Sequence, residues 1–318
     1  MNKVPFLNFE PIHSEIKVEM LKAFEEVYDS YWYVLGNKVK QFEEEYASFN
    51  HTKACVGVSN GLDALHLSLK ALGIGKGDEV IVPSNTYIAT VLAVSYVGAK
   101  PVFVEPNIET YNIDFSKIEE AVTPNTKAIM PVHLYGQACE MQPIMDIAKK
   151  YNLKVIYDAA HAFDVKYKDK SLLSYGDIST LSFHATKLFH TIEGGALIIN
   201  DDSLLEKVRY LINFGIKNQE EIPHLGTNAK MNEFEAAMGL CILDDIEDIK
   251  TNRKKVVENY KIGLESLVTF QKQNEQANEN YSYFPIVLEN EEELLKIQKV
   301  LNDENIFPRR YFYPSLDT

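Results

Sequence analysis

Short apolar runs alternate with helical patterns along most of this chain, and that alternation limits the folds it can adopt. Apolar runs typical of strands end at Val58, Pro83, Val104, His133 and Asp158, and the first four are each followed by a segment with helical spacing. A helix between two strands is the connection that parallel strands need. The sequence therefore predicts an α/β protein with a mostly parallel sheet and helices on both faces.

The length of 318 residues is enough for two domains. A helical pattern over residues 233–260 predicts the connection between them. We expect a large domain over residues 1–245 and a smaller one over residues 246–318. The smaller domain should contain a strand at 281–288 and a helix at 291–302.

The composition disfavours two classes of partner. The chain carries 46 acidic and 32 basic residues, a net charge of −14, so we expect no binding to nucleic acid or to an anionic membrane surface. No apolar run is long enough for a signal peptide or a membrane span, and the expected location is the cytoplasm. Cys55, Cys139 and Cys241 lie far apart without the pairing of a metal site, and we interpret them as buried apolar residues.

A polar segment between two apolar runs, residues 181–196, has Lys187 at its centre. A lysine whose amine is desolvated loses its proton near neutral pH and can then form a Schiff base with an aldehyde. Ser182 lies just upstream, close enough for its hydroxyl to bind a phosphate beside the lysine. Taken alone, Lys187 has the simpler interpretation of an exposed lysine in a loop.

A second segment changes that interpretation, because its apolar strand, residues 154–158, ends on the carboxylate of Asp158. Open α/β sheets bind their ligands at the carboxyl ends of strands. A Schiff-base lysine and a strand-end aspartate together suggest pyridoxal 5′-phosphate, which needs a carboxylate to keep its ring nitrogen protonated. The turn at residues 59–61, between a strand and a helix, adds an anion site of low specificity, since amides at a helix N-terminus favour phosphate.

Three short motifs make the chain similar to a known family. They are Asp-Ala-Ala-His at residues 158–161, Ser-Phe-His-Ala-Thr-Lys at 182–187 and Glu-Gly-Gly-Ala at 193–196. Over nearly its whole length the chain resembles the pyridoxal-phosphate-dependent nucleotide-sugar aminotransferases of the DegT/DnrJ/EryC1/StrS family. The resemblance implies the type-I aminotransferase fold, a large domain plus a smaller α/β domain. Members of that family continue beyond the position of Thr318, so we expect only part of the small domain here.

The resemblance also implies roles for individual residues. Lys187 would hold the cofactor and move protons, Asp158 would protonate the pyridine nitrogen, and the ring of Tyr87 would stack on the cofactor. His161 would approach the phenolic oxygen of the cofactor, with a structural histidine bonded to backbone as the alternative.

The same resemblance implies that residues from both subunits of a homodimer hold the phosphate. Leu62 replaces the hydroxyl residue that the family carries at the helix start, so backbone amides must act there. Asn228 would reach the phosphate in the neighbouring subunit, which predicts shared active sites. The family's usual Tyr-Arg after that asparagine is Ala229-Lys230 here. The implied phosphate ligands are Asn60, Gly61, Leu62, Ser182 and Asn228.

The implied reaction moves an amino group from glutamate to a keto carbon of a nucleotide-linked deoxyhexose, with dTDP as the expected carrier, in amino-deoxysugar biosynthesis such as that of O-antigen. The motifs disagree on which carbon. Residues 33–36 and 59–63 resemble enzymes that aminate a 3-keto sugar, whereas residues 158–163 and 183–195 resemble enzymes that act on the 4-keto isomer. We favour the 4-keto sugar because the motif beside His161 lines the region of the sugar ring.

Other interpretations remain open at this level. The same chemistry on the 3-keto isomer is one, and a ligand-binding relative without turnover is another. A 3-dehydratase relative would have a histidine at position 187, and the lysine there argues against it. Arg309 and Arg310 are candidates to bind an anionic group of the substrate, or else they are exposed charges.

Overall fold

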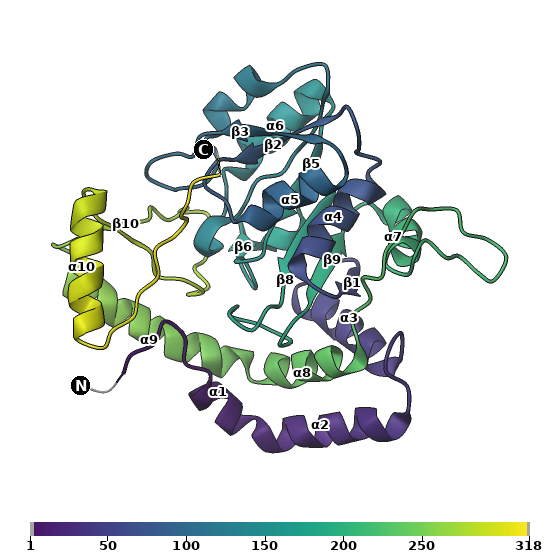
Figure 1. The fold of residues 1–318 in the computed structure, drawn as a ribbon, viewed down its shortest axis with the longest axis horizontal. Coiled ribbons are helices and arrows are strands. Elements are labelled where there is room, and N and C mark those ends of the chain that lie inside the picture. Colours follow the sequence, from purple (N-terminus) through teal and green to yellow (C-terminus); the bar gives the residue numbers. More distant parts are fainter. Residues whose placement is uncertain (1–2, 317–318) are drawn as a thin grey trace.

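A computed structural model describes residues 3–316 of the chain, except for the side chain of Ile12. Its centre is a seven-stranded sheet (Figure 1). All strands run in one direction except β9, which lies antiparallel between β1 and β8. The predicted mostly parallel sheet is therefore confirmed. In spatial order the strands are β1 (Cys55–Val58), β9 (Gly195–Ile199), β8 (Ile178–Ser182), β5 (Lys154–Asp158), β4 (Thr126–Ile129), β2 (Glu79–Pro83) and β3 (Lys100–Val104).

The sheet is buried on both faces. Successive side chains of a strand point to opposite faces, and here both sets of side chains lie in the core. In β2, Val80 and Val82 pack on one side and Ile81 on the other; in β5, Ile156 packs on the first side and Val155 on the second. Helices cover both sides, as the sequence predicts. The first side is covered by α4 (Gly61–Ala71), α5 (Ile88–Tyr96) and α7 (Leu205–Leu211), and the second by α3 (Asn37–Phe49), α6 (Met141–Tyr151) and α8 (Glu233–Asp244).

Two elements after the sheet differ from the prediction. The expected helix over residues 233–260 is divided into α8 and α9 (Ile246–Leu264), because the backbone of Asp245 is not helical, with φ −99° and ψ 3°. The expected strand at 281–288 is reduced to β11 (Ile286–Val287), which pairs with β10 (Thr269–Phe270). Helix α10 (Glu291–Asp303) lies where the sequence predicts it. The domain boundary at residue 245 stays a prediction.

The amino-terminal segment connects distant parts of the molecule. It contains α1 (Glu10–Glu15) and α2 (Lys17–Ser30), which lie along α8 and α9 (Figure 1). Before α1, Val4 forms a parallel bridge with Ile306, which follows α10. β6 (Lys166–Tyr167) and β7 (Lys170–Ser171) form a small antiparallel hairpin outside the main sheet. Among residues 3–316, no helix has the length and apolar character needed to cross a bilayer.

The strand register brings the predicted motifs to one edge of the sheet. Asp158, the last residue of β5, is in register with Thr180, two residues before the end of β8 at Ser182. Gly195 pairs with Ser182 on one side and with Val58 on the other. The end of β1, the end of β8 and the end of β5 therefore meet, and a ligand at this edge can touch all three.

Candidate active site

The carboxylate of Asp158 is buried at the end of β5, with only 6% of the residue exposed. It accepts hydrogen bonds from the hydroxyl of Thr90 on α5, at 2.8 Å, and from the amide of Ala160, at 3.1 Å. Burial raises the pKa of this carboxyl, while these two donors and the positive charge of Lys187 act in the opposite direction. The site thus has a desolvated acid with two fixed donors.

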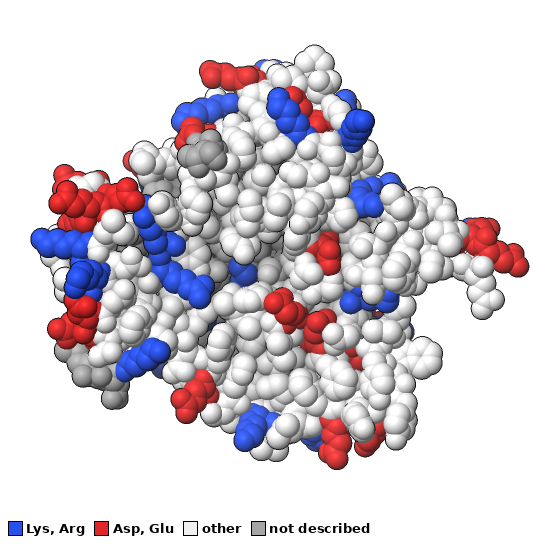
Figure 2. All heavy atoms as spheres, viewed as in Figure 1, with Lys and Arg blue, Asp and Glu red and all other residues white. Residues whose placement is uncertain are grey.

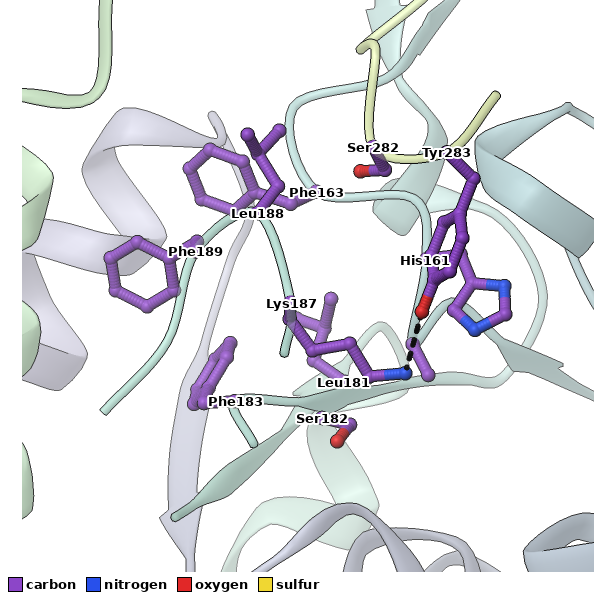
Figure 3. Close-up of a pocket in the computed structure, with 11 residues that line it drawn as sticks. His161, Phe163, Leu181, Ser182, Phe183, Lys187, Leu188, Phe189, Ser282 and Tyr283 are labelled. Atoms are coloured by element: carbon purple, nitrogen blue, oxygen red, sulfur yellow. Dashed lines mark hydrogen bonds between the residues drawn. The ribbon is translucent and has the colours of Figure 1, made fainter. Parts of the chain in front are cut away.

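Lys187 lies in the loop between β8 and β9, with its side chain directed into a cavity (Figure 3). Burial lowers the pKa of its amine to about 8, and Asp158 opposes that shift. A substantial neutral fraction therefore exists near neutral pH, as a nucleophilic lysine requires. The amine donates a hydrogen bond of 3.5 Å to the hydroxyl of Tyr283.

The loop that carries Lys187 is fixed by its own backbone and by aromatic packing. The amide of Ala185 donates to the carbonyl of Ile192 at 2.7 Å, and the amide of Lys187 donates to the carbonyl of His184 at 2.9 Å. Phe183 and Phe189 are buried and pack edge to face, with ring centroids 5.1 Å apart. The cavity is lined mainly by this loop, by the segment after Asp158 and by residues 282–283.

His161 lines the same cavity as Lys187 (Figure 3). Its Nδ1 accepts a hydrogen bond from the backbone amide of Tyr135 at 3.1 Å. Burial and the positive charge of Lys187 hold the pKa of His161 well below its usual range. The ring is therefore neutral with its proton on Nε2. The backbone bond expected of a structural histidine is present, and it leaves Nε2–H available as a donor.

The turn before α4 forms an anion site of the predicted kind. The side chain of Asn60 caps α4 by accepting from the amide of Asp63 at 2.8 Å. Within residues 3–316, the amides of Gly61 and Leu62 have no hydrogen-bond acceptor. These two donors at the start of an eleven-residue helix favour an anion.

Glycine at position 61 lets this helix start lie against the end of β8. A Cβ at position 61 would lie 2.7 Å from Cβ of Ser182, closer than two side chains can approach. Glycine at position 195 is needed for the same reason, because a Cβ there would lie 2.6 Å from the carbonyl of Asn60. The two amides and the hydroxyl of Ser182 are therefore neighbours, and Ser182 also lines the cavity of Lys187.

Of the predicted site residues, His161, Ser182 and Lys187 line that cavity, and Tyr87 and Asn228 are exposed outside its lining. Tyr87 precedes α5, is 61% exposed, and has its ring 6.4 Å from that of Phe312. Asn228 is exposed on the loop before α8, where its side-chain oxygen accepts from the amine of Lys230 at 2.6 Å. Lys230 also lies 4.6 Å from the centre of the ring of Phe214.

The two arginines near the carboxyl end have different surroundings. Arg310 forms an ion pair of 2.8 Å with Glu291 and packs over the ring of Tyr313, whereas Arg309 lies over the ring of Phe6 at 4.8 Å. Figure 2 shows Lys and Arg side chains beside the hollow between α10 and the rest of the molecule. Arg309 has no carboxylate within ion-pair distance among the described residues, so its charge is available to an anion.

Three residues of the site have no signal in the sequence. Thr90, within a helical pattern, contacts Asp158; Tyr283, in a stretch predicted as strand, contacts Lys187. Arg253, on α9, lines a second cavity that Lys187 also reaches, and it donates to the carbonyl of Ser282 at 3.1 Å. Each comes to the site through packing of a distant segment. No three His, Cys, Asp or Glu side chains of residues 3–316 are grouped as a metal site would require.

Comparison with known proteins decides the class of this site. The model of the DegT/DnrJ/EryC1/StrS aminotransferase family matches residues 14–318. The chain belongs to this family. The resemblance seen in its motifs and the predicted aminotransferase class are therefore confirmed, and pyridoxal 5′-phosphate is the cofactor of the class.

Individual relatives differ in the sugar that their names specify. The chain is 46% identical to the dTDP-3-amino-3,6-dideoxy-alpha-D-galactopyranose transaminase of Aneurinibacillus thermoaerophilus, over 81% of this chain and 71% of that protein. It is also 46% identical to the dTDP-4-amino-4,6-dideoxy-D-glucose transaminase of Shigella dysenteriae, over 80% of this chain and 70% of that protein. The names of these two equally similar relatives thus specify amino groups at different positions of the sugar.

A solved structure supports both the fold and the cofactor. NtdA from Bacillus subtilis with bound cofactor PMP superimposes with a TM-score of 0.87 at 32% identity, covering 99% of this chain and 73% of that one. The expected type-I aminotransferase fold is confirmed. The donor set of the present chain also fits the cofactor, because a buried carboxylate, a lysine with lowered pKa and two free helix-start amides lie at one sheet edge.

Proposed function

We propose that this aminotransferase moves an amino group from glutamate to the 4-keto carbon of a dTDP-linked 4-keto-6-deoxyhexose. The observation that carries the transamination is the pair formed by the buried amine of Lys187, with a pKa of about 8, and the buried carboxylate of Asp158. When bound, pyridoxal phosphate supplies the electron sink for the proton transfers of transamination. The residues of the chain supply binding, orientation and the proton carrier.

Lys187 has two functions in this proposal. It binds the cofactor covalently through its amine, and once displaced by the amino donor it is a free base. As a base it takes the proton from the donor carbon and returns it at C4′ of the cofactor. A pKa of about 8 suits both steps, because the amine gains and loses a proton close to neutral pH.

Asp158 holds a proton at the pyridine nitrogen. For this the carboxyl group must be ionised although it is buried, and the donors Thr90 and Ala160 favour that state. A protonated ring nitrogen adds a positive charge that favours the carboxylate further. His161 donates through Nε2 to the phenolic oxygen, and Tyr87 stacks on the ring of the cofactor.

The phosphate is held by the amides of Gly61 and Leu62 and by the hydroxyl of Ser182. Asn60 contributes by capping α4, since its side-chain oxygen is occupied by the amide of Asp63. Asn228 is directed to a partner subunit, and the enzyme is a homodimer with shared sites. The exposed position of Asn228 supports this arrangement.

The choice of the 4-keto sugar has a specific competitor. The segment beside His161 lines the cavity where the sugar ring must lie, and its motif resembles that of enzymes for 4-keto sugars. The relative from A. thermoaerophilus, named for a 3-amino sugar, is as similar to this chain as the one from S. dysenteriae, named for a 4-amino sugar. The 3-keto isomer is therefore the second candidate.

The test is incubation of the enzyme with pyridoxal phosphate, glutamate and dTDP-4-keto-6-deoxyglucose, with no isomerase present, followed by NMR of the product. Formation of a 4-amino sugar supports the proposal. A product that forms only after a 3,4-ketoisomerase is added replaces it by the 3-keto alternative. The Lys187→Ala variant serves as the control and should give no product.

A further inference from the structure

The hydroxyl of Tyr283 is the hydrogen-bond partner of the Lys187 amine (Figure 3). The two atoms are 3.5 Å apart, and the amine also lies 5.9 Å from the centre of the Tyr283 ring. Catalytic hydrogen bonds are often longer in a ligand-free site than during reaction. Tyr283 comes from the segment after α9, about 100 residues from the loop of Lys187, so no local chain geometry forces the contact.

Tyr283 is held in place by a buried network. Asn280 is 1% exposed and donates to the carbonyls of His161 and Phe163, at 2.9 and 2.8 Å. The amide of Ser282 donates to the side chain of Asn280 at 3.1 Å, and its carbonyl accepts from Arg253 at 3.1 Å. The residue before Tyr283 is thus fixed on both sides.

The ring of Tyr283 is fixed as well, and its hydroxyl stays neutral. The Tyr283 ring packs against the ring of His161, with the two centroids 4.4 Å apart. Burial raises the pKa of Tyr283, and Tyr311 and Tyr135 raise it further, while Arg253 and Arg309 act in the opposite direction. The group that faces the Lys187 amine is therefore a neutral hydroxyl near neutral pH.

We propose that Tyr283 is a catalytic partner of Lys187, and that its hydroxyl accepts a hydrogen bond from the lysine nitrogen throughout the proton transfer. A neutral amine that donates to this oxygen keeps its lone pair free for the donor carbon. After Lys187 has taken the proton, the ammonium still donates to the same oxygen. The proton then leaves Lys187 for C4′, and Tyr283 neither gains nor loses one. The inference rests on the proposed role of Lys187.

The first measurement follows Lys187 in the cofactor-free protein. Acetic anhydride labels neutral amines, and mass spectrometry reports the rate at Lys187 as a function of pH. In the wild type we expect a midpoint near pH 8. Tyr283→Phe removes the acceptor for the ammonium and should move the midpoint about one unit lower, the size expected for a hydrogen bond to a charged group.

Tyr135→Phe is the matched control. In the wild type, the ring of Tyr135 stacks on that of Phe312 in the same aromatic cluster. Within residues 3–316 the Tyr135 hydroxyl makes no hydrogen bond. Both variants keep the aromatic ring, and thermal unfolding checks that they fold. The midpoint of Tyr135→Phe should equal that of the wild type.

The second measurement is steady-state transamination. Tyr283→Phe should lower kcat about tenfold with little change in KM, because the lost contact acts on the proton transfer. An unchanged labelling midpoint overturns the proposal, whether or not kcat falls, since a fall alone would reflect packing. A shifted midpoint with an unchanged kcat overturns the catalytic role. If the wild type lacks transaminase activity, the proposed function fails, whereas the labelling still reports on the contact.

Discussion

The hydroxyl of Thr90 donates a hydrogen bond of 2.8 Å to the carboxylate of Asp158. Thr90 lies on α5 and Asp158 ends β5, so this bond attaches the helix to the acid of the site. Thr86 shares a second bond of 2.8 Å with the hydroxyl of Thr90. The chain of two hydroxyls favours an ionised Asp158 against the effect of burial.

Thr90→Val should therefore raise the pKa of Asp158. Less of the carboxyl is then ionised at low pH, and we expect kcat to fall about tenfold near the acid end of the activity range and to recover as the pH rises. The pH profile of kcat measures this. Thr86→Val, which removes only the outer hydroxyl, is the control and should have a smaller effect. Identical acid limbs for Thr90→Val and the wild type would contradict the assignment.

Two glycines with different surroundings, Gly61 at the approach of α4 to β8 and Gly263 on α9, should respond in opposite ways to substitution by alanine. Gly61→Ala places a Cβ 2.7 Å from that of Ser182, and we expect a loss of about 1–3 kcal/mol in the free energy of unfolding together with weaker binding of pyridoxal phosphate. Gly263→Ala, near the end of α9 with no atom within 4 Å of the added Cβ, should stabilise by up to about 1 kcal/mol. Denaturant unfolding and cofactor titration compare them.

Much of this arrangement could be predicted from the sequence, for identifiable reasons. Lys187 and Asp158 stand directly beside strand patterns, and the ends of parallel strands must meet, so their proximity follows from local periodicity. Thr90 and Tyr283 gave no such signal, because their contacts depend on how α5 and the segment after α9 pack. The shortness of β11 has the same origin, since the preceding residues bind the loop of His161 instead of a neighbouring strand.

Burial of Lys187 should destabilise the cofactor-free protein in a pH-dependent way. Its pKa falls from 10.5 to about 8 on folding, so the unfolded chain binds more protons between these values and stability rises with pH there. Below pH 8 the full cost of up to about 3 kcal/mol is present. Lys187→Met should therefore be more stable than the wild type at pH 7, with the difference vanishing towards pH 10.5.

Thermal and denaturant unfolding at pH 7 and at pH 10 measure this dependence. Lys40→Met is the control, because that lysine side chain is 74% exposed, and its effect should not change with pH. A Lys187→Met variant that is less stable than the wild type at pH 7 would show that the lysine is not desolvated in the folded protein.

The shared site predicts complementation between two inactive variants. Lys187→Ala lacks the covalent attachment, and Asn228→Ala lacks the proposed phosphate ligand for the partner. When the two are mixed and allowed to exchange subunits, each mixed dimer has one intact site, so about a quarter of wild-type activity should return. Light scattering should show a dimer at micromolar concentration. No recovery on mixing, or a monomer with full cofactor affinity, would refute the shared site.

The covalent role of Lys187 is the central claim, and one measurement tests it directly. The protein is incubated with pyridoxal phosphate, reduced with borohydride, digested and analysed by mass spectrometry. We predict a single modified peptide in which the mass of the reduced cofactor is carried by Lys187, and no specific attachment in Lys187→Ala. Cofactor fixed on another lysine, or none fixed on the wild type, would contradict the account, and absence of attachment would favour a ligand-binding relative without turnover.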